Sequence, residues 1–285
     1  MPALGDVLRA ARARFEPVSG SASLDAQLLM AEVLGVSRAH VLAHPERLLS
    51  DDQHAQYLAL AERRAAGEPI AYLLGRRAFY DREIGVSPAV LIPRPETEDL
   101  LERALTSPQA ARAACVAVDV GTGSGAIAVT FAALKPTAHV YATDLSPAAL
   151  DVARRNAQAQ ATRVTFLQGD LLTPVTDLGL KVDLLMANLP YIDSGVVPTL
   201  AVSQYEPIMA LDGGADGLDL VRRLIQQAPA VLKTGALILL EIGYDQGTRT
   251  ADLLRAAFPS ASVEIHQDLA GHDRIVTARL PDVID

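Results

Sequence analysis

Apolar and polar positions alternate with the period of a helix over the first 66 residues. The apolar positions at the start of the chain are Leu4, Val7, Leu8, Ala11 and Phe15, a spacing that predicts an amphipathic helix. Ser23 is predicted to cap a second helix that ends near Gly35, and further helices are predicted at about 39–44 and 51–66. Together these segments predict a small helical bundle without any cluster of residues suited to chemistry.

The pattern changes between residues 76 and 95. Two short apolar runs, Phe79-Tyr80 and Ile84-Gly85-Val86, predict the strands of a β-hairpin. Pro93 and Pro95 then predict a stiff, extended segment ahead of a helix through Leu100. We therefore predict three parts, which are an N-terminal helical bundle at 1–75, a hairpin linker at 76–95 and a larger domain at 96–285.

From Cys115 onward, apolar runs of strand length alternate with amphipathic segments of helix length. The predicted strands are 115–120, 138–143, 163–168, 181–187, 235–241, 261–266 and 273–280, and the predicted helices are about 125–134, 147–158, 216–232 and 246–257. This alternation predicts an α/β fold with a mainly parallel, seven-stranded sheet covered by helices on both faces. Sheets of this kind bind ligands at the carboxyl ends of their strands, at the switch point.

The first of these strands ends in a glycine-rich turn that opens a helix. The turn consists of Gly121, Thr122, Gly123, Ser124 and Gly125. Glycines are needed because the turn is tight and the backbone must approach a ligand that a Cβ would block. The pattern predicts a nucleoside site, but it fits a nicotinamide cofactor as well as S-adenosylmethionine.

Acidic residues end the next two strands. Asp144 can accept hydrogen bonds from both hydroxyls of a ribose, although taken alone it could also cap the helix that begins at Pro147. Asp170 can accept from the exocyclic amine of adenine or, equally well, cap a turn, and Leu171 offers an apolar wall for the ring.

The fourth strand of this domain ends in Asn188, Leu189, Pro190 and Tyr191. This run resembles the Asn-Pro-Pro-Tyr motif of amino and amide methyltransferases of the Rossmann-like class. A planar nitrogen is a poor nucleophile because its lone pair is delocalised, so it must be held with that lone pair facing the methyl group. The Asn188 side-chain oxygen and the Leu189 carbonyl would accept its hydrogens, and Tyr191 would stack on the planar group. Leu189 replaces the usual first proline, which keeps the carbonyl acceptor but loses rigidity.

Further motifs along almost the whole chain resemble the glutamine-amide methyltransferases of peptide chain release factors (the HemK family). These motifs are Glu68 to Gly75, Leu91 to Glu98, Tyr205 to Pro207 and Gly213 to Leu218. The resemblance implies a Rossmann-like class I methyltransferase domain after the helical bundle and the hairpin. It also implies that S-adenosylmethionine is the cofactor, with S-adenosylhomocysteine as its product.

The same resemblance implies a substrate, namely the glutamine in the Gly-Gly-Gln motif of class-1 peptide chain release factors, which the N-terminal bundle would help to recognise. By resemblance, the glycine turn, Asp144, Leu171 and Asn188 would contact the cofactor, and residues 188–191 would contact the glutamine. Many family members have an aromatic residue in place of Leu171, so adenine stacking is expected to be weaker here. Glu241 ends the fifth strand and either faces the site or is a solvated strand end.

Charge and composition limit the classes of partner, metal site and location that the protein can have. The net charge is −9, and residues 1–95 are neutral, so no basic surface predicts direct nucleic-acid binding. Cys115 is the only cysteine and the six histidines lack metal-ligand spacing. No apolar run is long enough for a membrane span. We therefore expect a cytoplasmic enzyme with no metal site and no membrane contact.

Other functions remain open at this stage. The same chemistry could act on a glutamine of a ribosomal protein, and the residue 188–191 motif would serve equally for adenine methylation of DNA, which the charge disfavours. A nicotinamide-dependent oxidoreductase explains the glycine turn but gives Asn188 no task. A binding module with the same fold would not need Asn188 either.

Overall fold

Five helices form the N-terminal part of the chain in the computed structural model, which describes residues 1–282. They are α1 (Leu4–Phe15), α2 (Ala22–Leu34), α3 (Arg38–Ala43), α4 (Asp51–Ala65) and α5 (Ile70–Leu74). These helices make up one compact unit, Met1–Arg76, and the chain from Arg77 onward makes up a second. Phe15, Leu29 and Tyr57 are fully buried in the core of the first unit.

Local signals explain where these helices begin. Ser50 and Gln53 form a reciprocal capping box at the start of α4. The prediction that Ser23 caps the second helix is wrong, because Ser21 occupies that position and Ser23 lies in the first turn. Ser21 uses its hydroxyl to donate to Asp25 instead of capping. The sequence prediction also missed α5, which is only five residues long.

A short hairpin opens the second unit and packs against its helices. Its strands are β1 (Arg76–Phe79) and β2 (Arg82–Gly85), and Tyr80, which we predicted to be in a strand, lies in the turn with a positive φ of 57°. The Asn156 side chain accepts from the Gly85 amide (2.8 Å) and donates to the Gly85 carbonyl (2.9 Å). Most of the predicted linker is therefore an integral part of the second unit.

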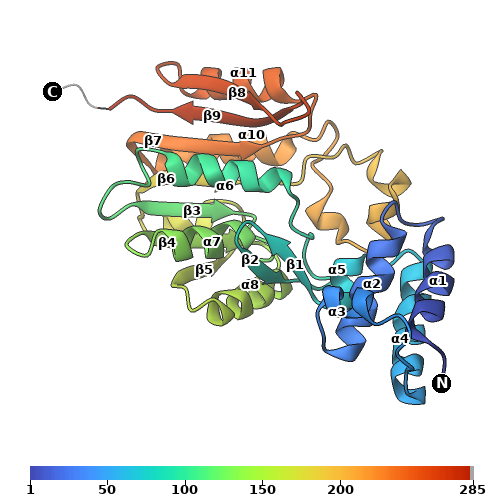
Figure 1. Cartoon of the computed structure of the whole chain (residues 1–285). Helices are drawn as coiled ribbons and strands as arrows, with labels where there is room; N and C mark the ends of the chain where they lie inside the picture. Colours follow the sequence, from blue (N-terminus) through green and yellow to red (C-terminus); the bar gives the residue numbers. More distant parts are fainter. Residues whose placement is uncertain (283–285) are drawn as a thin grey trace. The chain divides into compact units, whose positions relative to one another are not determined.

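The seven-stranded sheet has the predicted, mainly parallel form (Figure 1). Its strands are β3 (Val116–Val120), β4 (His139–Asp144), β5 (Val164–Gln168), β6 (Val182–Ala187), β7 (Leu232–Glu241), β8 (Ser262–Gln267) and β9 (Asp273–Arg279). The strand order is β5-β4-β3-β6-β7-β9-β8, and only the pairings of β9 are antiparallel. The fold class predicted from the sequence is confirmed.

Alternate residues of each central strand pack into two different apolar layers. Val118, Leu185 and Ile238 face one layer, with α9 (Thr173–Asp177), α10 (Asp219–Gln227) and α11 (Gly247–Ala257). In each of these strands, the residues next to the ones just named point to the opposite face and pack into the other layer. That layer contains α6 (Glu96–Thr106) and α7 (Ala126–Leu134). Helix α6 runs along the sheet in Figure 1. Burial on both faces explains why these strands are nearly all apolar. Helix α8 (Pro147–Ala159) packs beside β4 and β5.

The predicted helix at 216–232 is shorter than expected. Helix α10 begins at Asp219 because Gly217, with a φ of 74°, belongs to a loop, and it ends at Gln227. A 3-10 turn, η4 (Ala228–Ala230), follows, since Pro229 cannot donate a helical hydrogen bond. The loop between β6 and α10 holds three more 3-10 turns, η1 (Val197–Thr199), η2 (Ala201–Gln204) and η3 (Ile208–Ala210).

The packing of the hairpin predicts how the chain can be shortened. A fragment starting at residue 77 should unfold at a higher denaturant concentration than one starting at residue 88. The shorter fragment loses Phe79 and Ile84, which are buried to 1% and 0% exposure, and each such side chain contributes about 1.5–3 kcal/mol. Urea unfolding followed by circular dichroism measures the difference. Equal midpoints would contradict the account of the hairpin as part of the second unit.

Candidate active site

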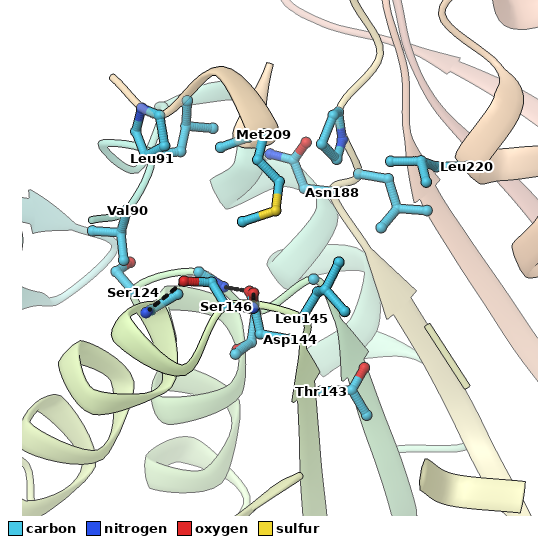
Figure 2. A pocket seen from close by; sticks show the side chains of 18 of the residues that line it. Val90, Leu91, Ser124, Thr143, Asp144, Leu145, Ser146, Asn188, Met209 and Leu220 are labelled. Atoms are coloured by element: carbon cyan, nitrogen blue, oxygen red, sulfur yellow. Dashed lines mark hydrogen bonds between the residues drawn. The ribbon is translucent and has the colours of Figure 1, made fainter. Parts of the chain in front are cut away.

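The candidate site lies where the strand order reverses at the centre of the sheet. Strand β3 pairs in parallel with β4 on one side and β6 on the other, with Val120 opposite Thr143 and Ala187. The residues that follow these strands therefore meet at one edge. A cavity of about 380 Å³ opens there. Figure 2 shows Asp144 on one side of this cavity and Asn188 on the other.

Most of the predicted site residues line this cavity, and two do not. Those that line it are Gly121, Thr122, Gly123, Ser124, Asp144, Asp170, Leu171, Asn188, Leu189 and Pro190. Gly125 and Tyr191 are not among them. A Cβ on Gly125 would lie 3.0 Å from the Ala153 Cβ on α8, so this glycine allows close helix packing.

The glycine turn leaves its backbone open to a ligand. Gly123 has a φ of 55°, and an added Cβ there would have no protein atom within 4 Å. Gly121 has a φ of 72°, and its added Cβ would meet only the Leu189 side chain, at 3.0 Å. The amides of Gly121 and Thr122 both donate to the Thr143 carbonyl at 2.9 Å, which fixes the turn to β4.

Asp119, a residue that we did not predict to be part of the site, holds the glycine turn in place through hydrogen bonds. It is buried to 1% exposure and accepts from the Thr122 hydroxyl (2.6 Å) and the Ala128 amide (3.2 Å). Burial raises the pKa of Asp119 to about 7, and these two hydrogen bonds oppose the rise. An acidic residue within an apolar strand was the signal that could have revealed it.

Asp144 is tied to the same turn. Its carboxylate accepts from the Gly123 amide and the Ser146 amide, both at 2.8 Å. Burial raises its pKa, and the backbone hydrogen bonds oppose that rise. Ser146, not Asp144, caps α8 by accepting from the Ala149 amide. Each carboxylate oxygen keeps a further lone pair for a ligand.

The next two predicted residues are held in different ways. Asp170 forms an ion pair with Arg223, which also lines the cavity. Leu171 is buried and has a positive φ of 50°, which is uncommon for a residue with a branched side chain. Backbone strain of this kind tends to gather at ligand sites.

The side chains of residues 188–191 point in different directions. The Asn188 amide nitrogen donates to the Thr97 hydroxyl at 3.0 Å, which leaves its oxygen as the free acceptor. Leu189 is buried in the apolar layer that contains Val118. The backbone carbonyl of Tyr191 accepts from Gln246 at 2.9 Å. Burial raises the pKa of the Tyr191 phenol to about 12, so it stays protonated.

A glycine-containing loop wraps closely around this turn. A Cβ on Gly213 would lie 2.6 Å from the Pro190 carbonyl oxygen, and one on Gly217 would lie 2.2 Å from the Tyr191 carbonyl oxygen. Both glycines are therefore required by backbone contact. Their backbones confine residues 190 and 191.

A buried carboxylate joins two segments that line the cavity on the Asn188 side. Glu206 accepts from the Arg94 guanidinium (2.6 Å) and from the Ile92 amide (3.1 Å). Leu91 and Met209, which flank these groups along the chain, line the cavity (Figure 2). This contact between distant segments could not be read from the sequence.

Glu241 is buried to 2% exposure, so the alternative of a solvated strand end is wrong. Burial raises its pKa to about 7, while hydrogen bonding from Thr97 and Asn188 opposes the rise. Among residues 1–282, no group of three or more His, Cys, Asp and Glu side chains is placed to hold a metal ion. No helix in that range is long and apolar enough to cross a membrane.

Comparison with known proteins identifies the class of this fold. Residues 117–202 match the family model described as a methyltransferase domain. A 16S rRNA N2 G1207 methyltransferase from T. thermophilus, solved with AdoMet and guanosine, shares the fold with a TM-score of 0.51 and 18% identity, over 72% of this chain and 49% of that one. The protein is a Rossmann-like class I methyltransferase.

Closer relatives specify the family. Residues 6–75 match the model described as the PrmC N-terminal domain. The release factor glutamine methyltransferase of Moorella thermoacetica is 44% identical over 258 residues, 90% of each chain. That of Xylella fastidiosa is 42% identical over 284 residues, 99% of each chain. The chain belongs to the release factor glutamine methyltransferase family.

The close backbone contact at Gly217 predicts a large effect of a small substitution. Gly217→Ala should lower the free energy of unfolding by about 3 kcal/mol or more, because the added Cβ meets the Tyr191 carbonyl in a tightly packed loop. Gly271→Ala is the matched control, since Gly271 also has a positive φ (83°) but open space around it. The control should lose only the left-handed backbone penalty of about 1–2 kcal/mol. If denaturant unfolding shows equal losses of unfolding free energy for Gly217→Ala and Gly271→Ala, the close contact at Gly217 is refuted.

Proposed function

We propose that this protein methylates the side-chain amide nitrogen of the glutamine in the Gly-Gly-Gln motif of class-1 peptide chain release factors, with S-adenosylmethionine as methyl donor. The observation that carries the proposal is the hydrogen bond from the Asn188 amide nitrogen to Thr97. It leaves the Asn188 oxygen as an acceptor beside a nucleoside-type glycine turn. Membership of the family supports the choice of substrate.

The residues around the cavity fit this cofactor. Gly123 leaves open space at the turn, and Asp144 keeps lone pairs for the two ribose hydroxyls. Leu171 supplies an apolar wall for the adenine, and Asp170 would accept from its amine while paired with Arg223. When bound, S-adenosylmethionine supplies an electrophilic methyl group.

The chain's own residues would then orient the glutamine. The Asn188 oxygen and the Leu189 carbonyl accept the two amide hydrogens, so the nitrogen lone pair faces away from both acceptors and toward the cofactor. Positioning and exclusion of water supply most of the effect. No strong base is needed if the proton leaves after the methyl group has moved. Tyr191 does not line the cavity, so the predicted stacking on the planar group is not part of this proposal. The N-terminal unit would help to recognise the release factor.

A methyl-transfer assay with labelled cofactor tests this function. Purified release factor, ribosomes and duplex DNA are offered in parallel. Labelling of the release factor at the Gly-Gly-Gln glutamine is the expected result. Labelling of a ribosomal protein or of DNA alone would replace the proposed substrate with one of the alternatives.

The role given to Asp144 predicts a loss of cofactor affinity. Asp144→Ala should weaken binding of S-adenosylhomocysteine by about 1–3 kcal/mol, because buried ribose hydroxyls lose their acceptor. Calorimetry measures the change, with Asp151→Ala, an exposed carboxylate on α8 paired with Arg154, as the control. Unchanged affinity in the Asp144 variant would show that the ribose binds elsewhere.

The role of Asn188 predicts a loss of turnover. Asn188→Ala should slow methyl transfer by roughly two to three orders of magnitude, the scale for losing one orienting polar contact. Affinity for S-adenosylhomocysteine should change less than the rate. Leu189→Pro should keep the rate within about tenfold, because its carbonyl remains. A fully active Asn188→Ala enzyme would overturn the proposed mechanism.

A further inference from the structure

The amide group of Asn188 has two ends of opposite character, and only one of them suits the proposed reaction. Its oxygen accepts hydrogen bonds, whereas its nitrogen only donates. A half-turn of the side chain would present the nitrogen to the substrate amide, where two donors would oppose each other. The proposed function therefore needs something that keeps the nitrogen end turned away from the substrate.

Thr97 meets that nitrogen end. Its hydroxyl accepts from the Asn188 amide nitrogen at 3.0 Å, and the residue is only 4% exposed, in the first turn of α6. A hydroxyl has a single hydrogen, so a threonine that accepts from Asn188 is free to donate in another direction. Thr97 alone does not fix the orientation, because it could instead donate to the Asn188 oxygen.

Glu241 lies behind Thr97 and Asn188. It ends β7, next to β6, where Leu240 lies opposite Ala187, the residue before Asn188. Thr97 and Asn188 lie near enough to Glu241 for their polar side chains to lower its pKa, and its Oε2 has no hydrogen-bond partner within residues 1–282. Thr97 and Asn188 line the cavity, whereas Glu241 does not. Glu241 is therefore separated from the cavity by these two residues.

We infer that Glu241 and Thr97 are positioning residues that fix the amide of Asn188 with its oxygen toward the substrate nitrogen. An ionised carboxylate can only accept, so the Thr97 hydroxyl and the Asn188 amide nitrogen can face it only as donors. The hydroxyl then has only lone pairs left for Asn188, and the Asn188 nitrogen must donate to them. The direction of each hydrogen bond follows from the one before. This inference rests on the proposed function, because it explains how Asn188 is aimed.

Protonation of Glu241 would remove that constraint. A protonated carboxyl can donate to Thr97, and Thr97 can then donate to the Asn188 oxygen, which turns the amide round. Burial raises the pKa of Glu241 to about 7 from the usual 4.5. The charged groups that face it are Arg274 on β9, which lowers its pKa, and Glu96 on α6, which raises it. Tyr191, the other ionisable neighbour, stays protonated in this range.

Two substitutions separate this role from simple packing. Thr97→Val keeps the shape and removes the hydroxyl, and Thr97→Ser keeps the hydroxyl. Thr97→Val should lower kcat about 10- to 100-fold, the scale of a small misplacement of a reacting group. The KM for release factor and the affinity for S-adenosylhomocysteine should stay within about threefold. Thr97→Ser should recover most of the rate. Thr130→Val is the matched control, since Thr130 is also buried (0% exposed, against 4% for Thr97), lies on α7 and does not line the cavity.

Glu241→Gln tests the dependence on charge. The wild-type kcat should fall as the pH drops through the pKa of Glu241, and this fall should be absent in Glu241→Gln. Folding gives an independent readout. Since the folded pKa (about 7) is above the usual value of 4.5, Glu241 favours folding most at low pH, and that contribution is lost as the pH rises through about 7. The melting temperature of the wild type should therefore fall relative to that of Glu241→Gln as the pH rises.

The outcomes separate this inference from the proposed function. A wild-type enzyme that does not methylate release factor would overturn the proposed function itself. If Asn188→Ala is inactive while Thr97→Val is fully active, only the positioning role is overturned. The same holds if the fall of kcat at low pH is unchanged in Glu241→Gln. The kcat of the double variant Thr97→Val/Glu241→Gln should be no lower than that of Thr97→Val alone, because both residues act through one chain of hydrogen bonds. Additive losses would contradict such a chain.

Discussion

The parallel pairing of β3 with β6 is the contact on which the whole site depends. Because Val120 lies opposite Ala187, the glycine turn that follows one strand and the Asn188 turn that follows the other begin side by side. In the proposed function, the first turn binds the nucleoside of the cofactor and the second binds the substrate amide. The switch in strand order at β3 opens the space between them, so the methyl donor and its acceptor would meet there.

Backbone contacts keep this arrangement fixed. Leu189 packs its side chain against Gly121, while Gly213 and Gly217 press against residues 190 and 191. The leucine that replaces the usual proline thus joins the two turns through the apolar layer. Rigidity that a second proline would supply locally is supplied here by neighbouring backbone. Catalysis by positioning requires such support, since small displacements of reacting groups are costly.

The strands and the line-up of their ends could be predicted from the sequence because apolar runs, glycines and prolines are local signals. All seven strands lie within a few residues of their predicted positions. The failures were of three kinds. Ser23 and Tyr80 were misplaced because neighbouring residues competed for the same cap or turn. The roles of Thr97 and Glu206 were missed because each depends on a contact with a distant segment. Asp119 was overlooked for another reason, since its partners Thr122 and Ala128 are close in sequence and the acidic residue in an apolar strand was a local signal. Thr97 meets Asn188 across 91 positions of sequence, a pairing that no local pattern contains.

The most direct test of the account is a crystal structure with S-adenosylhomocysteine and a glutamine-containing peptide from a release factor. The account predicts that the ribose hydroxyls bind Asp144, and that the glutamine amide donates to the Asn188 oxygen and the Leu189 carbonyl. The amide nitrogen should then face the sulfur of the cofactor. A glutamine bound elsewhere, or an Asn188 amide with its nitrogen toward the substrate, would contradict it.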